Sequence, residues 1–384
     1  AVVRRCAACG GPARAVRVAA PLHCAALARL CEAAGCHLPK CDDASRQPAI
    51  SRASQTLSPI ASSSVQALNR ISSCGHRRTS KARSFSTTAS SSGEPSSIKL
   101  KYFSAWFCPF AHRATLALEH HQIPYQWEEA LGWEKRAPSG DEEFSASERQ
   151  DWWYHWKSPG LLAANPQGMV PTLLDETTGR AVTESLVCIE FIDELAASRT
   201  RTGQHGASSG VGMSAPPLLP SCPFERARAR LAADAVNKSV TSAYYSVLMR
   251  IDAEERRQAF EKLLNGLRSF VRGSRGDFWG GDTLGYVDCV LLPYAYRLYA
   301  IEHYRGADFA VPTSGEDGLW ERYHAWFARA TALEYVAGTL PEKQRYLRHV
   351  AKYAEGRARS KVGNAVRRGA AAHEYDDAID GDKH

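Results

Sequence analysis

One cysteine stands where a helix is predicted to begin. Cys108 follows a predicted strand and precedes Pro109, and proline suits the first helical turn because its missing N–H would have no partner there. Unpaired N–H groups and the helix dipole favour negative charge at such an end, so we expect Cys108 to have a lowered pKa and partial thiolate character. His112 and Arg113, one turn on, could add positive charge. The alternative is a buried structural thiol.

The residues after this cysteine limit its redox chemistry. Cys108 is followed by Pro-Phe-Ala, so there is no Cys-x-x-Cys pair at this position. This argues against a dithiol reductase and favours monothiol chemistry, in which an external thiol resolves a mixed disulfide. The four cysteines after residue 97 are widely spaced, which suits free thiols better than a disulfide framework. They are Cys108, Cys188, Cys222 and Cys289.

The other seven of the 11 cysteines lie within residues 1–93. Cys6 and Cys9 have the spacing of half a zinc site. The cysteines that follow do not form a second close pair, which a structural zinc site requires. We therefore expect no bound metal.

The positive charge is concentrated in the N-terminal quarter. The chain of 384 residues has a net charge of +7, but residues 1–93 hold 13 Lys and Arg and three acidic residues, so the remainder is slightly acidic. We therefore expect no nucleic-acid partner. We also expect no membrane span, because no apolar run approaches about 18 residues.

The leader has the composition of an organelle transit peptide. Residues 47–93 contain no acidic residue and are rich in Ser, Thr, Arg and Ala, as such peptides are. Arg83-Ser-Phe85-Ser86 resembles a mitochondrial processing site. We predict that residues 1–97 form a presequence or disordered leader and that the protein is mitochondrial. A merely disordered tail on a cytoplasmic protein is the alternative.

The hydrophobic pattern after the leader predicts a small α/β domain over residues 98–197. The expected order is strand, helix, strand, helix, strand, strand, helix, with the first two strands parallel because a helix crosses between them. Polar residues 134–151 read as a surface loop. The predicted elements are strand 98–104, helix 109–121, strand 123–129, helix 157–164, hairpin 170–183 and helix 184–197.

The rest of the chain divides by composition. Residues 198–220 are rich in Ser, Gly and Pro and read as a linker. Residues 221–341 show helical periodicity throughout and predict an all-α domain. Residues 342–384 form a charged C-terminal tail, for which we expect a solvated helix and a frayed end.

Four motifs, in order, resemble the cysteine-type (omega-like) glutathione S-transferase family. The resemblance implies a thioredoxin-like N-terminal domain followed by an all-α helical domain, a homodimer, and glutathione as co-substrate. The motifs are an active-site turn at Trp106–Arg113, a glutathione-binding loop at Asn165–Pro171, a γ-glutamyl site at Glu184-Ser185, and a helical-domain motif at Phe278–Gly281 and Gly285–Asp288.

The resemblance also implies a site. Cys108 would be the catalytic residue and would carry glutathione as a mixed disulfide. Pro171 would be a cis proline, which turns the backbone of Val170 toward the tripeptide. For Lys157 two interpretations are equally favoured: a contact with glutathione, or an exposed lysine without a role. The implied glutathione-binding residues are Phe110, Lys157, Met169, Val170, Pro171, Glu184 and Ser185.

Two features depart from the family pattern. Gly285 stands where a Ser or Thr helix cap is usual, which affects stability rather than chemistry. The stretch 133–156 is long and rich in aromatics. These side chains either form local core, line an aromatic-substrate site, or cover the cleft. They are Trp133, Trp152, Trp153, Tyr154 and Trp156.

The function expected from these observations is glutathione-dependent thiol transfer or dehydroascorbate-type reduction, on a small disulfide, thiol or electrophilic substrate. The first alternative is a glutathionyl-hydroquinone or glutathionyl-ketone reductase, which would use the same cysteine. The second is a non-catalytic binding or regulatory protein with the same fold, because fold alone does not fix function.

Overall fold

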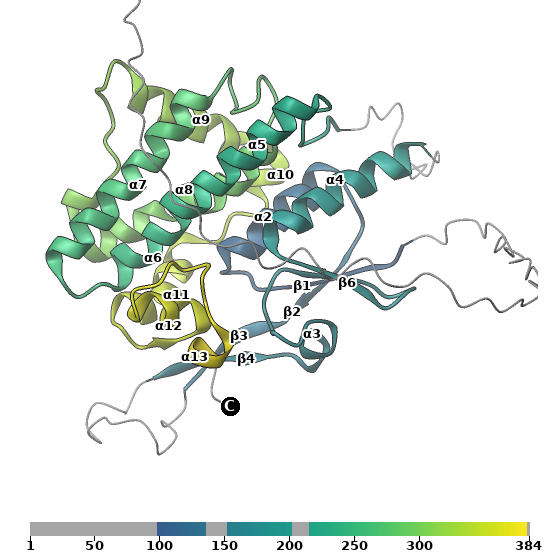
Figure 1. Ribbon diagram of the computed structural model, residues 1–384, viewed down its shortest axis with the longest axis horizontal. Coiled ribbons are helices and arrows are strands. Elements are labelled where there is room, and N and C mark those ends of the chain that lie inside the picture. Colours follow the sequence, from purple (N-terminus) through teal and green to yellow (C-terminus); the bar gives the residue numbers. More distant parts are fainter. Residues whose placement is uncertain (1–97, 136–151, 202–214, 382–384) are drawn as a thin grey trace, which may run out of the picture. The chain divides into compact units, whose positions relative to one another are not determined.

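Residues 98–135, 152–201 and 215–381 are described by a computed structural model of the chain (Figure 1). The predicted leader 1–97 and its processing site lie outside these residues, as does most of the predicted loop 134–151. No helix in the described ranges is long and apolar enough to span a membrane.

The N-terminal domain is built on a four-stranded mixed sheet in the order β2-β1-β5-β6. Strands β1 and β2 run parallel, with Lys101 opposite Gln126, because α2 crosses between them. Strand β5 is antiparallel to both β1 and β6. The predicted α/β arrangement with one parallel pair is confirmed. The elements are β1 (Leu100–Ser104), α2 (Pro109–His120), β2 (Gln126–Glu129), α3 (Pro159–Ala164), β5 (Thr172–Asp175), β6 (Arg180–Thr183) and α4 (Ser185–Arg201).

Helices α2 and α4 pack together on one face of this sheet, and α3 lies on the other (Figure 1). The core beneath α2 is apolar, with Tyr102, Leu116 and Leu118 almost fully buried. The Tyr102 hydroxyl donates to the backbone oxygen of Ala111 at 2.6 Å. This buried bond fixes the start of α2 relative to β1, and Cys108 lies between them.

A second sheet corrects the sequence prediction. Strands β3 (Leu131–Lys135), β4 (Trp153–Lys157) and β7 (Ala358–Arg359) form a three-stranded sheet in the order β3-β4-β7. Residues 134 and 135 thus belong to a strand and not to a loop, and Lys157 ends β4 instead of opening a helix. Local sequence does not indicate this sheet, because β7, which completes it, comes from the far end of the chain.

The all-α domain surrounds one central helix. Helix α8 is buried along most of its length and contacts helices from both sides of the domain (Figure 1). A π-helical turn separates α5 from α6. The elements are α5 (Pro223–Val236), the π-helix (Asn237–Thr241), α6 (Ser242–Met249), α7 (Ala253–Gly273), α8 (Tyr286–Arg305), a 3₁₀ turn (Ala307–Phe309), α9 (Leu319–Ala332) and α10 (Glu334–Ala337).

The start of α8 depends on a buried carboxylate. Asp288 accepts hydrogen bonds from the backbone N–H of Gly285 and Trp279 and from the indole N–H of Trp326, at 2.9, 3.0 and 2.8 Å. Burial raises the pKa of Asp288 to about 6, although the hydrogen bonds from these three donors act to lower it. Asp288 therefore secures the helix start even though Gly285 has no side chain to cap it.

The predicted solvated tail is wrong for residues 342–381. They form α11 (Lys343–Ala354), β7, α12 (Lys361–Arg367) and α13 (Asp377–Asp380). Tyr346, Val350 and Tyr353 recur at helical spacing on α11 and are buried. The count of basic residues hid this apolar stripe, because the charges occupy the opposite, exposed face of the helix.

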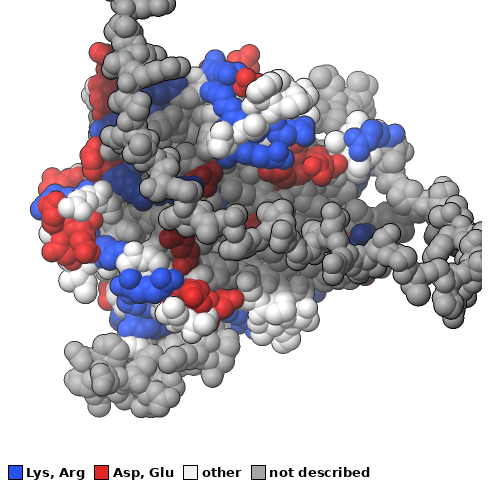
Figure 2. All heavy atoms as spheres, viewed as in Figure 1, with Lys and Arg blue, Asp and Glu red and all other residues white. Residues whose placement is uncertain are grey.

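Exposed charges on the all-α domain occur as mixed pairs. Lys and Arg side chains lie beside Asp and Glu side chains across the face shown in Figure 2. Arg268 on α7, for example, bonds both Glu261 and Glu316. Such exposed pairs add little stability individually.

Candidate functional site at Cys108

Cys108 is the N-cap residue of α2, immediately before the first helical residue, Pro109. Its N–H donates to the carbonyl of Ala105 at 2.9 Å, and its carbonyl accepts from the N–H of His112 at 3.0 Å. The side chain is half-buried, and its Sγ lies 4.0 Å from the carbonyl oxygen of Val170. The peptide bond between Val170 and Pro171 is cis, as predicted. The two sequence motifs that contain these residues therefore meet at the thiol.

The thiol borders a small cavity of about 50 Å³. Of the residues predicted for the site, Cys108, Phe110, Lys157, Met169 and Val170 line it. Pro171, Glu184 and Ser185 do not. The described residues that line it include no carboxylate side chain. The cavity is therefore apolar and basic in character.

The remaining predicted residues are outside the cavity lining. Glu184 is exposed and has a positive φ of 65°. Ser185 opens α4 and is buried, and its hydroxyl accepts from Arg113 at 3.1 Å. Pro171, the next residue after Val170 in the chain, is buried. The structure thus places the predicted γ-glutamyl pair at the start of a helix, where N–H groups can hold a carboxylate.

Burial overturns the expected pKa of the cysteine. Removal from water raises the pKa of the Cys108 thiol, because the charged thiolate loses its hydration. The N–H groups of Ala111 and Phe110, and then the charges of Arg297 and Arg113, act in the opposite direction. The helix-start effect that we predicted is present but weaker than burial.

Of the two basic residues that follow the cysteine, His112 does not act as predicted. His112 is buried between Thr339 and Arg297, at 2.8 and 3.2 Å. Burial and the Arg297 charge hold the pKa of His112 well below its usual value, so its ring is neutral at pH 7. His112 therefore adds no positive charge at the thiol.

Arg113 joins the two domains. Its buried guanidinium donates to Ser185 of α4, to the carbonyl of Val290 on α8, and to Asn237 and Thr241 of the π-helix, at 2.7–3.1 Å. It still favours the thiolate through its charge. Its main visible role is to fix α2 against the helical domain.

The cavity wall that sequence reasoning missed comes from α6 and the C-terminal segment 342–381. These residues are Tyr245, Tyr346, His349, Val350, Tyr353, Ser360, Lys361 and Val362. The spacing of Tyr346, His349, Val350 and Tyr353 along one helical face was the available signal. The many basic residues of the segment mask this apolar spacing when the sequence alone is considered.

The tryptophans of the 133–156 stretch do not line this cavity. Trp133, Trp153 and Trp156 instead line a groove that shares Phe107, Leu131 and His349 with the cavity as a common wall. The indole N–H of Trp133 donates to Nδ1 of His349 at 3.1 Å. Trp152 and Tyr154 are buried. The local-core interpretation thus holds for part of the stretch, and the aromatic surface of the cavity comes from other residues.

The fold and this site define a class of protein: a thioredoxin-like domain, with a thiol at its first helix, followed by an all-α domain. Residues 107–195 match the family model for the glutathione S-transferase N-terminal domain, and residues 250–329 match that for the C-terminal domain. The chain belongs to the glutathione S-transferase family, and it is a transferase.

Individual relatives agree with this assignment. Glutathione transferase GST 23 of maize is 32% identical over 194 residues, which cover 50% of this chain and 76% of the relative. Probable glutathione S-transferase GSTU6 of rice is 30% identical over 252 residues, covering 64% and 89%. The structure of rice GST1 with glutathione superposes with a TM-score of 0.51 at 22% identity, covering 68% of this chain and 98% of the other, which supports the fold.

Proposed function

We propose that this chain is an omega-like thiol transferase that uses glutathione through Cys108. The observation that carries the proposal is the position of the Cys108 thiol: it borders the cavity, starts α2 and faces the carbonyl oxygen of Val170. Cys188 and Cys289 are buried in helices, and Cys222 is exposed on the helical domain. Among the described cysteines, Cys108 is the one that borders the cavity.

The reaction takes two exchanges. The Cys108 thiolate attacks the glutathione sulfur of a mixed disulfide, which forms the bond between Cys108 and glutathione and releases the substrate thiolate to take a proton. A second glutathione thiolate then attacks the bound glutathione sulfur. Glutathione disulfide leaves, and the Cys108 thiolate is restored.

Dehydroascorbate-type reduction would use the same intermediate. Cys108 adds to a substrate carbonyl, and glutathione attacks the cysteine sulfur and displaces the reduced substrate, which takes up protons. The enzyme is left as the Cys108–glutathione disulfide, which a second glutathione reduces as before. Both electrons therefore come from glutathione.

The neighbouring residues suit a bound tripeptide. The backbone of Val170 can pair with glutathione as a strand would, next to Met169 and Phe110. Lys157 offers a cation at the cavity, and Glu184 with Ser185 can hold the γ-glutamyl group at the start of α4. Precise holding of the thiol in line with the cysteine is what makes such an exchange fast.

A second candidate is favoured by the aromatic lining. Phe107, Phe110, Tyr245, Tyr346 and Tyr353 all border the cavity. Such a lining suits an aromatic glutathione thioether, such as a glutathionyl-hydroquinone. Cys108 would attack the glutathione sulfur, the aryl carbon would take a proton, and glutathione would again reduce the mixed disulfide.

The test is glutathione transfer from glutathione disulfide to the full chain, followed by peptide mapping. Cys222 provides a matched control, because it too precedes a proline at a helix start but is exposed and does not line the cavity. We expect glutathione at Cys108, loss of thiol-transferase turnover in Cys108→Ser, and full turnover in Cys222→Ser. Binding of glutathione without reaction at Cys108 would instead favour the non-catalytic alternative. Relative turnover on a small disulfide and on an aromatic thioether separates the two enzymatic candidates.

We also propose a mitochondrial location and a homodimer. The first rests on the acid-poor, Arg- and Ser-rich composition of residues 47–93, and the second on the family resemblance. A reporter fused to residues 1–97 should enter mitochondria, and the protein should sediment as twice its chain mass. A reporter that stays in the cytosol would refute the mitochondrial location. Sedimentation as a monomer would refute the homodimer.

A further inference from the structure

The cavity at Cys108 carries a buried cation that comes from the far end of the chain. Lys361 is the first residue of α12, and its side chain is 8% exposed. Its ammonium group donates to the carbonyl oxygen of Gln167 at 2.8 Å. Gln167 lies in the loop that leads to Val170. Lys361 therefore connects the C-terminal segment to the loop that lines the cavity beside the Cys108 thiol.

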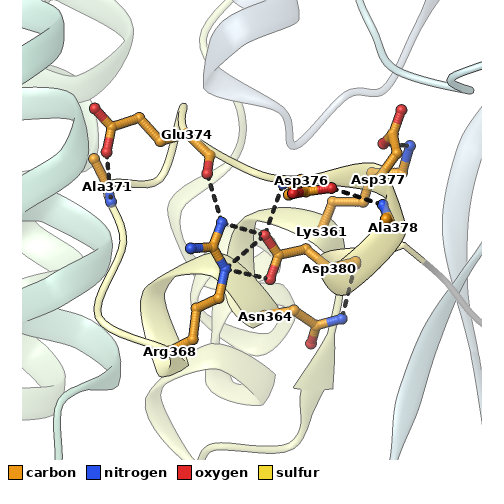
Figure 3. Close-up of polar contacts among 9 residues, drawn as sticks. All are labelled: Lys361, Asn364, Arg368, Ala371, Glu374, Asp376, Asp377, Ala378 and Asp380. Carbon is orange, nitrogen blue, oxygen red and sulfur yellow. Dashed lines mark hydrogen bonds and ion pairs between the residues drawn. The ribbon is translucent and has the colours of Figure 1, made fainter.

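Lys361 is also held by a carboxylate from the same segment. Its ammonium group lies 2.5 Å from Oδ1 of Asp377, on α13 (Figure 3). Asp377 is 46% exposed. The neighbouring carboxylates of α13 have other partners: Asp376 caps the helix at Ala378, and Asp380 binds Arg368 (Figure 3). Asp377 is thus the acid of this helix that reaches the cavity cation.

The Lys361–Asp377 pair matters because the cavity lining is basic. Lys157 and Lys361 are its lining lysines, and no carboxylate is among the described residues that line it. Both lysines contact the same turn, because a Cβ at Gly168 would lie 2.5 Å from Cδ of Lys157. A buried ammonium group must keep an anionic or polar partner, since leaving it unpaired is costly.

We propose that Lys361 is a carboxylate-binding residue of the Cys108 site, and that Asp377 occupies it as an internal competitor. A ligand carboxylate that enters the cavity replaces the carboxylate of Asp377. Lys361 remains paired throughout, so the exchange avoids the cost of an unpaired buried cation. Asp377 is exposed enough to turn to water when it is displaced.

The ligand class is a small thiol or disulfide that carries a carboxylate, and glutathione carries two. This identification rests on the proposed function, whereas the cation and its competitor do not. Both residues lie outside the segments 107–195 and 250–329 that match the family models. The device therefore belongs to the C-terminal segment of this chain.

Two alkylating probes of equal length test the proposal without requiring turnover. Iodoacetate carries a carboxylate and iodoacetamide is neutral, and both convert the Cys108 thiolate to a thioether with loss of iodide. We would measure the ratio of the two rates at Cys108 by peptide mapping of the full chain. Cys222 in the same sample serves as an internal reference, because it is exposed and does not line the cavity that contains Lys361.

The two key variants should move this ratio in opposite directions. Lys361→Met should lower the preference for iodoacetate, and Asp377→Asn should raise it, each by about threefold to tenfold, as expected for a partly buried charge contact. The double variant should give the same rate ratio as Lys361→Met. Without the Lys361 cation, removing the competing carboxylate of Asp377 frees no binding partner for iodoacetate. Lys343→Met, an exposed lysine change on the same segment, should leave the ratio unchanged.

The outcomes that would overturn the proposal are distinct. An unchanged ratio in Asp377→Asn would refute the competition, and it is informative even if Lys361→Met fails to fold. Equal acceleration of both probes would show that the substitutions merely open the cavity. If the ratios shift as expected but Cys108→Ser retains thiol-transferase turnover, the carboxylate site stands and the proposed function falls. If Cys108→Ser abolishes turnover but the rate ratios do not change in the Lys361 and Asp377 variants, the proposed function stands and the carboxylate site is refuted.

Discussion

The imidazole of His349 stacks on the ring of Phe107, with ring centroids 3.9 Å apart and planes inclined by 24°. Phe107 immediately precedes the cysteine, and His349 comes from α11 in the C-terminal segment. Nδ1 of His349 also accepts the indole N–H of Trp133. Burial, followed by the charge of Lys352, holds the pKa of His349 well below its usual value, so the ring stacks as a neutral imidazole.

We predict that His349→Ala opens the site. The substitution removes the stack on Phe107 and leaves the indole N–H of Trp133 without its acceptor, which should cost about 2–4 kcal/mol of folding free energy. Carbamidomethylation of Cys108 should become several-fold faster at a fixed pH. Arg348→Ala changes the exposed neighbour on the same helix and should alter neither quantity. Unchanged alkylation in His349→Ala would show that α11 does not control access to the thiol.

We predict that Cys108 reacts with iodoacetamide along a pH profile displaced upward. An unfolded thiol titrates near pH 8.5, and burial raises the pKa of Cys108 in the folded chain. The profile of the folded protein should therefore have its midpoint above that of the same protein in urea. A midpoint below the unfolded value would mean that the helix start and Arg297 outweigh burial after all.

The same shift has a consequence for stability, with a definite sign. The folded site favours the neutral thiol, so this contribution is complete below the pKa of the unfolded thiol and is lost as the pH rises through the folded value. The free energy of unfolding should therefore fall less steeply above pH 8.5 in Cys108→Ser than in the unmodified chain. Parallel curves from urea titrations would contradict this. Cys188 and Cys289 are unchanged in the comparison and cancel from it.

We predict that Arg113→Ala destabilises the chain by about 3–5 kcal/mol, the usual cost when a buried, fully paired charged group is removed from its partners. Ser185, Asn237, Thr241 and the Val290 carbonyl would all lose their donor. Arg329→Ala provides the control, because Arg329 is partly exposed and bonds a partly exposed residue, Asp277. Urea unfolding measures both. A loss below 1 kcal/mol in Arg113→Ala would show that water replaces its contacts.

We predict that Asp288→Ala costs about 2–4 kcal/mol, because three N–H groups, two of them buried, lose their acceptor. The carboxylate of Asp288 also joins the start of α8 to Trp326 on α9. Asp282→Ala, an exposed change in the preceding loop, should have little effect on the urea midpoint. Equal midpoints for the two variants would show that the helix start does not depend on the carboxylate.

The parts of the site that could be predicted are those written in continuous motifs. Cys108 before Pro109 marks a helix start from local backbone chemistry alone. The loop that ends at Pro171, with its cis peptide bond, was predicted through the family resemblance, which also linked it to the motif at Cys108. Lys157, for which the sequence left a glutathione contact and an exposed lysine equally open, lines the cavity, and the element that carries it is a strand and not a helix.

The parts that could not be predicted depend on contacts between distant segments. Strand β7 has two residues, which is too short to show any periodicity, and it pairs with β4 about 200 residues earlier. The pKa of Cys108 depends on burial, to which α11 and α12 contribute, and no local pattern reports that. Likewise the pairing of Lys361 with Gln167 becomes visible only once the C-terminal segment is placed on the N-terminal domain.

The pairing of β7 with β4 also sets an order of events during synthesis. Translation proceeds at about 5–20 residues per second, so the ribosome needs tens of seconds, at the slower rates, to pass from Cys108 to Lys361. Throughout that interval the nascent N-terminal domain lacks α11 and α12, whose side chains line the cavity at the thiol. Chaperones and cellular oxidants therefore meet a more accessible sulfhydryl on the growing polypeptide than they meet on the finished protein.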